Sequence, residues 1–244
     1  MTLVSALQSR ERDIDLVSNE LNALVPALIT RFNSEVTPRL LSRLPTEPLP
    51  GTPRQASSFR ARVSLLIEYS FVEMLADFLN DESDALNVTF NTTNQFSDFF
   101  IRNENWQVNL RIDVKTLHDR SAEASARFSE PVAYIREFDD YLLYVSWQWR
   151  TVDHRGIDVI APAVIDAVFI PAVEVAQERD LRQTLSGGMF SEAGDALAAS
   201  GIADTNFGKI NRLIYHTRRD SPDLSPRLRK LLQMMEPDVT DATA

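Results

Sequence analysis

Apolar and polar residues alternate strictly from Trp106 to Lys115, in the stretch W-Q-V-N-L-R-I-D-V-K. A period of two predicts a β-strand that rests one face on a core and turns the other outward. The polar face carries Arg111, Asp113 and Lys115 side by side. The side chains expected to be buried are Trp106, Val108, Leu110, Ile112 and Val114.

A second strand is predicted just before this one. Phe96–Arg102 (F-S-D-F-F-I-R) is rich in β-prone residues, and Asn103–Asn105 (N-E-N) is typical of a turn. The two strands would form a hairpin, with Asp98 on one and Asp113 on the other. An acid on each strand, with a lysine nearby, provides the side chains that a metal-dependent phosphodiesterase requires. An ordinary solvated strand face has the same residue types.

The register of this hairpin decides between the two interpretations. Directly opposed residues of an antiparallel pair share a side of the sheet. Asp98 opposite Arg111 would reach the polar face, whereas Asp98 opposite Leu110 would point into the core. A plain three-residue loop, with Arg102 opposite Trp106, would give the buried arrangement unless a bulge intervenes.

Helical spacing of apolar residues predicts helices in the first third of the chain, over residues 1–44 and again from about Ser57 to Asn80. Four prolines and a glycine between them make Pro45–Pro53 a linker. Glu68 lies beside the apolar stripe of the second helix, where an acid needs a partner. The expected buried face of that helix comprises Val63, Leu66, Ile67, Ser70, Phe71, Met74, Leu75 and Phe78.

The second half of the chain contains further strand and helix patterns. Together they predict an α/β fold with a central mixed β-sheet flanked by helices and preceded by a helical N-terminal segment. We divide the chain into a packing or dimerisation segment (1–50), an α/β domain (54–236) and a disordered tail (237–244). The predicted elements are a helix at Pro131–Phe138, a strand at Tyr141–Trp149, one or two strands in Val159–Ala176 broken at Pro162 and Pro171, a loop at Gly187–Gly208, and helices at Asn211–His216 and Ser225–Met235.

Composition narrows the class of protein. With 244 residues, 44% of them hydrophobic, the chain can bury one sizeable core. No apolar run approaches the roughly 20 residues that span a bilayer, so we expect a soluble protein. The chain has no cysteine and no evident export signal, which favours the cytoplasm. Any metal would need oxygen ligands, which indicates Mg²⁺ or Mn²⁺ rather than zinc.

The charge is uneven. A net charge of −10 argues against a general nucleic-acid binder. Between Lys209 and Lys230, however, seven basic and two acidic residues give a local charge of +5, which leaves −15 for the remainder. Such a basic patch can bind phosphates, and we expect that binding to depend steeply on salt.

Asp98, followed by Asp113-Val114-Lys115 on the adjacent strand and preceded by a helix that bears Glu68, resembles the PD-(D/E)XK nuclease superfamily. Within that superfamily, size and the lack of an appended domain resemble a type II restriction endonuclease. The resemblance covers about residues 60–176. One departure is Ser97, which stands where the pattern has proline.

The resemblance implies a role for each of these residues. Asp98 and Asp113 would bind Mg²⁺ through hard oxygen ligands, with the Val114 carbonyl as a further ligand. Lys115 would orient or deprotonate the attacking water, or stabilise the phosphate. Glu68 would be an outer-sphere or second-metal ligand. Mn²⁺ is a possible substitute for Mg²⁺.

The implied substrate is double-stranded DNA, cut at a specific sequence by a homodimer, because a symmetric dimer matches a palindromic site. Two alternatives remain, a structure-specific repair nuclease and a non-catalytic protein-interaction module on a similar scaffold. The expected DNA contacts are Arg60, Arg62, His118, Arg120, Arg127, Asn206, Lys209, Arg212, Arg218 and Arg219.

Overall fold

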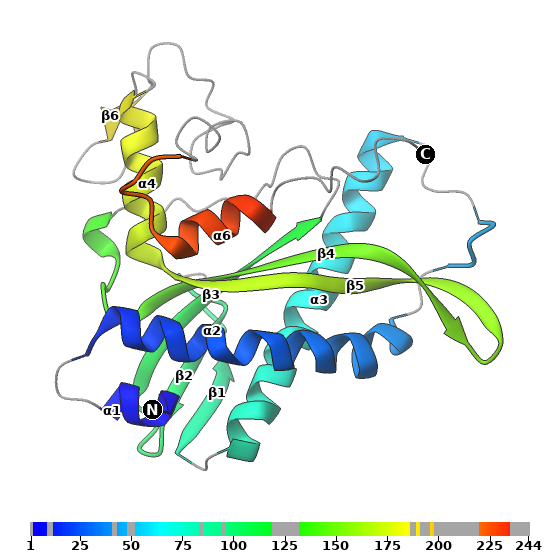
Figure 1. Cartoon of the computed structure of the whole chain (residues 1–244), viewed down its shortest axis with the longest axis horizontal. Helices are drawn as coiled ribbons and strands as arrows, with labels where there is room; N and C mark the ends of the chain where they lie inside the picture. The colour runs from blue at the N-terminus through cyan, green and yellow to red at the C-terminus, as the bar shows by residue number, and fades with distance from the viewer. Residues whose placement is uncertain are drawn as a thin grey trace.

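The structure, a computed structural model, describes residues 2–8, 12–40, 43–47, 52–82, 85–93, 96–118, 132–185, 189–190, 196–197 and 220–234. Figure 1 shows the arrangement of the elements. The helices are α1 (Leu3–Gln8), α2 (Ile14–Arg31), α3 (Pro53–Glu82), α4 (Ala172–Leu185) and α6 (Pro226–Met234), with shorter helical turns η1 (Phe32–Val36), η2 (Thr37–Arg39) and η3 (Val132–Tyr134). The strands are β1 (Leu86–Phe90), β2 (Phe99–Asn103), β3 (Val108–His118), β4 (Asp140–His154), β5 (Ile157–Pro171), β6 (Met189–Phe190) and β7 (Ala196–Leu197).

Five strands form one mixed sheet in the order β1-β2-β3-β4-β5. Neighbouring strands are antiparallel except β3 and β4, which run parallel. This confirms the predicted α/β class with a central mixed sheet. Helix α3 spans the range predicted for the helix that bears Glu68, and α6 lies where the helix at Ser225–Met235 was expected.

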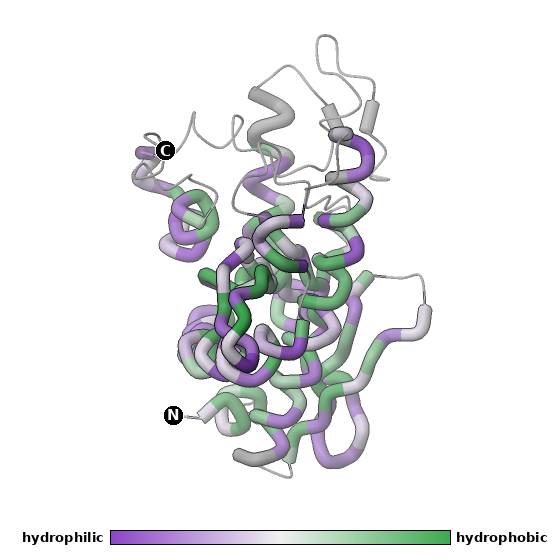
Figure 2. The backbone as a smooth tube through the Cα atoms, turned by 90° about the vertical axis from the view of Figure 1, so that its right-hand side faces the viewer, coloured by the Kyte–Doolittle hydropathy of each residue, from purple (hydrophilic) through white to green (hydrophobic). Residues whose placement is uncertain are grey.

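Hydrophobic side chains cover both faces of this sheet. Successive residues of a strand point to opposite faces, and β4 follows this rule. Leu143 and Val145 pack with α1, α2 and α3, whereas Leu142 and Tyr144 pack with α4 and α6. Figure 2 shows the hydrophobic stretches gathered in the middle of the molecule. The sheet is therefore the middle layer, between two groups of helices.

Side-chain amides from the N-terminal helices cover the outer edge of β5. Asn22 donates to the Phe169 carbonyl and accepts from its N–H, both at 2.9 Å. Asn33 makes the same pair of bonds with Val164, at 2.8 and 2.9 Å. An exposed strand edge can pair with other chains, and these amides occupy the backbone hydrogen-bonding groups of Phe169 and Val164 on that edge. Segment α2–η2 thus takes the place of a sixth strand.

Outside the predicted hairpin, four expectations about secondary structure and burial were wrong. Strand β5 continues through Pro162, which is tolerated because β5 is an edge strand. Residues from Ala172 onward form helix α4 rather than a strand. The helix expected at Pro131–Phe138 is the single turn η3. Leu66, expected in the buried face of α3, is 52% exposed.

No helix among the described residues is both long enough and apolar enough to cross a membrane.

Candidate functional site

Asp98 and Asp113 meet on one side of the sheet. Asp98 lies immediately before β2, and its N–H donates to the Ile112 carbonyl on β3 at 2.9 Å. Its Oδ2 accepts a hydrogen bond from the Val114 N–H at 2.6 Å. These two bonds hold the Asp98 carboxylate against β3 at the position of Asp113, to which it is also hydrogen-bonded.

A β-bulge in β3 makes this meeting possible. Near the turn, Arg102 pairs with Val108, but beyond the bulge Ile101 pairs with Leu110, so that Asn109 is the extra residue. Without the bulge, the pairing set by the turn would place Asp98 opposite Ile112, whose side chain is fully buried. The bulge changes the register by one residue and returns Asp98 to the polar face.

The prediction that Asp98 stands opposite Arg111 in the hairpin was wrong by two residues. Phe100, rather than Asp98, stands opposite Arg111. Because Phe100 and Asp98 are two residues apart, they share a side, and the condition that Asp98 and Asp113 face the same way is still met. Arg111 instead forms an ion pair at 2.5 Å with Asp140, which is fully buried.

The alternating stretch itself is a strand only from Val108 onward. Leu110, Ile112 and Val114 are buried as predicted. Trp106 was predicted to be buried with them, but it is 61% exposed and lies in the turn, where its N–H donates to the Asn103 carbonyl at 2.9 Å. It has a φ of +61°, so it follows a tight turn in the left-handed conformation rather than beginning the strand.

Lys115 and Glu68 complete the group of charged residues. The Lys115 Nζ forms an ion pair with the Asp113 carboxylate, and both side chains are mostly buried. Burial raises the pKa of Glu68 to about 7; the charge of Asp98 adds to this rise, and Lys115 opposes it. Glu68 is therefore close enough to both strands to sense their charges, although it comes from α3.

Asp113 is also a perturbed acid. Burial raises its pKa to about 6, the charge of Lys115 works in the opposite direction, and the charge of Asp98 raises it further. Its ion pair with Lys115 therefore does not fully offset the loss of water and the neighbouring acid. Perturbed carboxyl groups that cluster at one place are a mark of functional sites.

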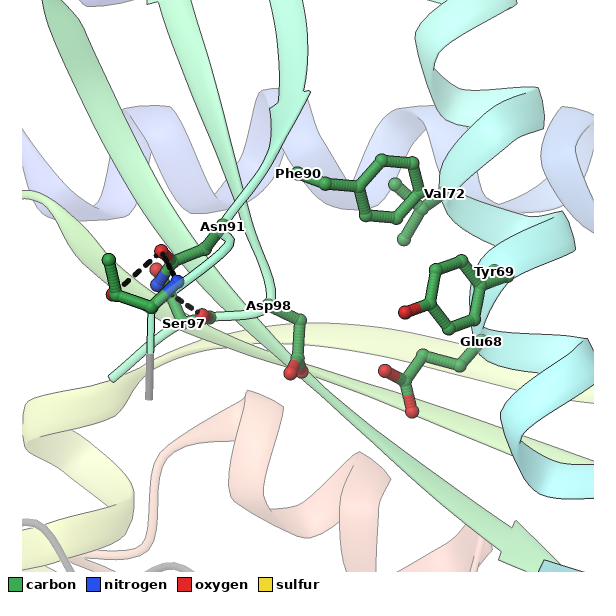
Figure 3. A pocket seen from close by; sticks show the side chains of 8 residues that line it. Glu68, Tyr69, Val72, Phe90, Asn91, Ser97 and Asp98 are labelled. Atoms are coloured by element: carbon green, nitrogen blue, oxygen red, sulfur yellow. Dashed lines mark hydrogen bonds between the residues drawn. The ribbon is translucent and has the colours of Figure 1, made fainter. Parts of the chain in front are cut away.

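Next to the acids lies a cavity of about 340 Å³ (Figure 3). Figure 3 shows Tyr69 and Phe90 on one side with Glu68 next to Tyr69, Asn91 and Ser97 on the other side, and the Asp98 side chain between them. The side chains that line it are Glu68, Tyr69, Val72, Phe90, Asn91, Thr93, Ser97 and Asp98.

Ser97 has an unusual backbone conformation, with a φ of +92°. Proline has its φ fixed near −65°, so it could not occupy this position without rearrangement. The departure from the family pattern at Ser97 therefore matches the local backbone. Ser97 is 4% exposed, and its Oγ has no hydrogen-bond partner among the described residues.

The donor atoms suit a hard divalent cation better than any other metal. Asp98 and Asp113 supply adjacent carboxylate oxygens, and Glu68 supplies a third carboxylate nearby. A bound cation would reduce the electrostatic repulsion among these three carboxylates. As the side chains stand, however, no three His, Asp or Glu residues of the described chain converge closely enough to hold a metal ion.

Of the residues expected to contact DNA, the structure describes Arg60, Arg62 and His118. Arg62 is exposed on α3. Arg60 is half-buried and directly follows Phe59, which stacks on Trp149. The His118 ring packs edge-on against Trp147 at 4.5 Å, so it is part of the core boundary. None of these three lines the cavity. The expected contacts outside the described residues are Arg120, Arg127, Asn206, Lys209, Arg212, Arg218 and Arg219.

Several residues of the site had no part in the sequence interpretation. Tyr69, Phe90 and Asn91 line the cavity but belong to no motif. Tyr69 is adjacent to Glu68, and Phe90-Asn91 ends a strand close to Asp98 in sequence. An exposed aromatic residue beside a candidate acid was the available signal.

Comparisons with models of known protein families, with curated proteins and with solved structures found no match for this chain.

Proposed function

We propose that this chain is a Mg²⁺-dependent endodeoxyribonuclease that cleaves double-stranded DNA at a specific sequence, with a restriction-endonuclease-like form of the α/β fold. The observation that carries the proposal is the bulged hairpin, which brings Asp98 to the side of Asp113 and Lys115. An ordinary solvated strand face does not require a β-bulge that brings two acids together. It would also not be expected to lie next to a third acid, Glu68, from α3.

The chain's own residues divide the work of phosphodiester hydrolysis among them. Asp98 and Asp113 offer the oxygen ligands, with the Val114 carbonyl as a further one. When bound there, Mg²⁺ would supply charge neutralisation at the phosphate and a more acidic water. Lys115, which forms an ion pair with Asp113, would orient or deprotonate the attacking water or stabilise the phosphate. Glu68 would be an outer-sphere or second-metal ligand.

Double-stranded DNA, a homodimer and the substitution of Mn²⁺ for Mg²⁺ belong to the same proposal. A symmetric dimer would cut both strands of a palindromic site. The basic stretch between residues 209 and 230 is the proposed phosphate-binding region, because it has the positive charge that the rest of the chain lacks.

Plasmid cleavage with Mg²⁺ tests the function. We expect discrete fragments from the wild-type protein and at least a hundredfold loss of rate in Asp113→Asn and Lys115→Ala, because each removes a group at the reacting phosphate. DNA retention and the folded state should remain.

The matched control is Glu73→Gln, an exposed acid of α3, which should cut as the wild type does. Full activity of Asp113→Asn would show that the site is wrongly assigned. Smearing instead of discrete bands would indicate a structure-specific or repair nuclease.

A non-catalytic interaction module is the second candidate. The ion pair between Lys115 and Asp113 favours this candidate, because a lysine can have the purely structural role of neutralising a neighbouring acid. An uncut plasmid, together with no binding of divalent cations, would support this alternative.

A further inference from the structure

Two aromatic rings form one wall of the cavity beside the acids. Tyr69 comes from α3 and Phe90 from the end of β1, and their ring centroids are 5.1 Å apart with a 30° angle between the planes. Both are large apolar side chains, yet Tyr69 is 52% exposed and Phe90 is 48% exposed. Their position at the cavity offers a ligand an aromatic surface (Figure 3).

The opposite wall is polar. The Asn91 amide Nδ2 donates to the Ser97 carbonyl at 2.8 Å, and its Oδ1 accepts from the Thr93 N–H at 2.9 Å. Ser97 is 96% buried, and its Oγ has no hydrogen-bond partner in the part of the chain that the structure describes. A buried hydroxyl without a partner is costly, and so is a non-glycine residue with a φ of +92°. Unpaired buried polar groups and strained backbone conformations both occur at functional sites, including ligand-binding sites.

A nucleobase matches the chemistry of these two walls. Its flat faces are apolar and stack on aromatic rings, while its edge carries donors and acceptors for hydroxyl and amide groups. The volume of about 340 Å³ is within the range of small-molecule sites. A base inside a duplex is stacked on both faces by its neighbours, so only an unpaired base can use such a wall.

We propose that the cavity lined by Tyr69, Phe90 and Ser97 binds an unpaired nucleobase of the DNA strand whose neighbouring phosphate lies at Asp98 and Asp113. This inference rests on the proposed nuclease function and specifies its substrate, a strand with a base that is single-stranded or extruded from the duplex. Tyr69 and Phe90 are the stacking residues, and Ser97 contacts the base edge.

Binding of short labelled oligodeoxynucleotides to the full chain tests the proposal, with Ca²⁺ replacing Mg²⁺ to limit cutting and fluorescence anisotropy as the readout. The probes are a single strand, an abasic strand of equal length and a fully paired duplex. We expect Tyr69→Ala and Phe90→Ala each to weaken binding of the single strand about five- to hundredfold, the range of stacking on one aromatic side chain. Binding of the abasic strand should not change.

Two control variants sharpen the result. Tyr69→Phe keeps the ring and should bind as the wild type does, and Tyr134→Ala removes a tyrosine that is 63% exposed but does not line the cavity. A penalty that extends to the fully paired duplex would identify an extruded base, and a penalty confined to single strands would identify a single-stranded substrate. Thermal melts establish that each variant is folded.

Unchanged affinity in both alanine variants, equal losses for the base-bearing and abasic strands, or no binding of the wild type to any base-bearing strand would each overturn the base site. The same preparations are assayed for plasmid cleavage with Mg²⁺. Cleavage without base-dependent affinity rejects the base site and leaves the nuclease. Base-dependent affinity without cleavage rejects the nuclease and leaves a nucleic-acid-binding cavity.

Discussion

Asp113 is the residue in which the crowding of the acids has its clearest consequence. Burial and the charge of Asp98 raise its pKa to about 6, in spite of the Lys115 ammonium group bound to it. In the unfolded chain the same carboxyl group has a pKa near 3.8. Between these values the folded protein holds a proton that the unfolded chain has released. The free energy of unfolding therefore falls as the pH rises through this interval.

For the metal-free protein this gives a prediction of stability against pH. Asp113→Asn should be more stable than the wild type by about 1–3 kcal/mol above pH 7, because a neutral amide avoids the cost of a buried charge. The difference should shrink as the pH falls below 6 and vanish only below about pH 3, where the wild-type carboxyl group is protonated in both states. Urea denaturation at a series of pH values, in a chelating buffer, measures it.

Glu73→Gln is the control for replacing an acid by its amide, because Glu73 lies at an exposed position of α3. A wild type that is more stable than Asp113→Asn at pH 8 would contradict the direction of the pKa shift.

Among the elements, the β2–β3 hairpin depends on a contact far away in sequence. The Arg12 guanidinium donates to the carbonyl of the bulged Asn109 at 2.9 Å and to its side-chain oxygen at 3.2 Å, and also pairs with Asp139. A bulge leaves backbone groups without a ladder partner, and Arg12 satisfies one of them. The N-terminal segment thereby stabilises the register on which Asp98 depends.

Arg12→Ala should lower the free energy of unfolding by about 1–3 kcal/mol, because it leaves a largely buried carbonyl and a carboxylate without their partner. Hydrogen exchange of the β2–β3 amides should become faster, and cleavage should weaken with it. Arg31→Ala is the matched control, since Arg31 forms ion pairs with Glu35 and Asp77 at 3.3 Å with exposed partners and should cost under about 1 kcal/mol. Equal effects of the two variants would argue against a special role of the bulge contact.

Elements whose burial follows a simple period were predictable. Alternation identified Leu110, Ile112 and Val114, and helical spacing identified α3, because each side chain meets the core at a fixed interval. Trp106 and Pro162 were not predictable in this way. The left-handed turn at Trp106 and the edge position of β5 depend on which strands are neighbours, and no local pattern contains that information.

The candidate site shows the same limit. Asp98, Asp113 and Lys115 carry a recognisable spacing, but their meeting depends on a bulge that one residue, Asn109, creates. The sequence implies the condition on the register, but it does not determine whether the hairpin meets that condition. The aromatic wall of Tyr69 and Phe90 joins elements whose approach only the fold determines.

For the molecule as a whole, the proposed cation should act as a stabiliser. A ligand that binds only the folded state adds about 2.7 kcal/mol at a hundred times its dissociation constant. For a domain of this size we expect Mg²⁺ at that level to raise the melting temperature by about 5–10 °C. Scanning calorimetry with and without a chelator measures the shift.

The double variant Asp98→Asn/Asp113→Asn lacks both proposed carboxylate ligands and should melt at the same temperature with and without Mg²⁺. An equal rise in the wild type and the double variant would place the cation elsewhere on this acidic chain.

The amides that cover β5 have a consequence for how the chain is made. The bonds of Asn22 to Phe169 and of Asn33 to Val164 span 147 and 131 residues. During synthesis from the N-terminus, α2 emerges early and must wait for β5 before these amides find their partners. Such distant pairings slow folding. A ribosome-bound chain that ends before residue 171 therefore lacks its closing contacts, and we expect the finished sheet to form only late in translation.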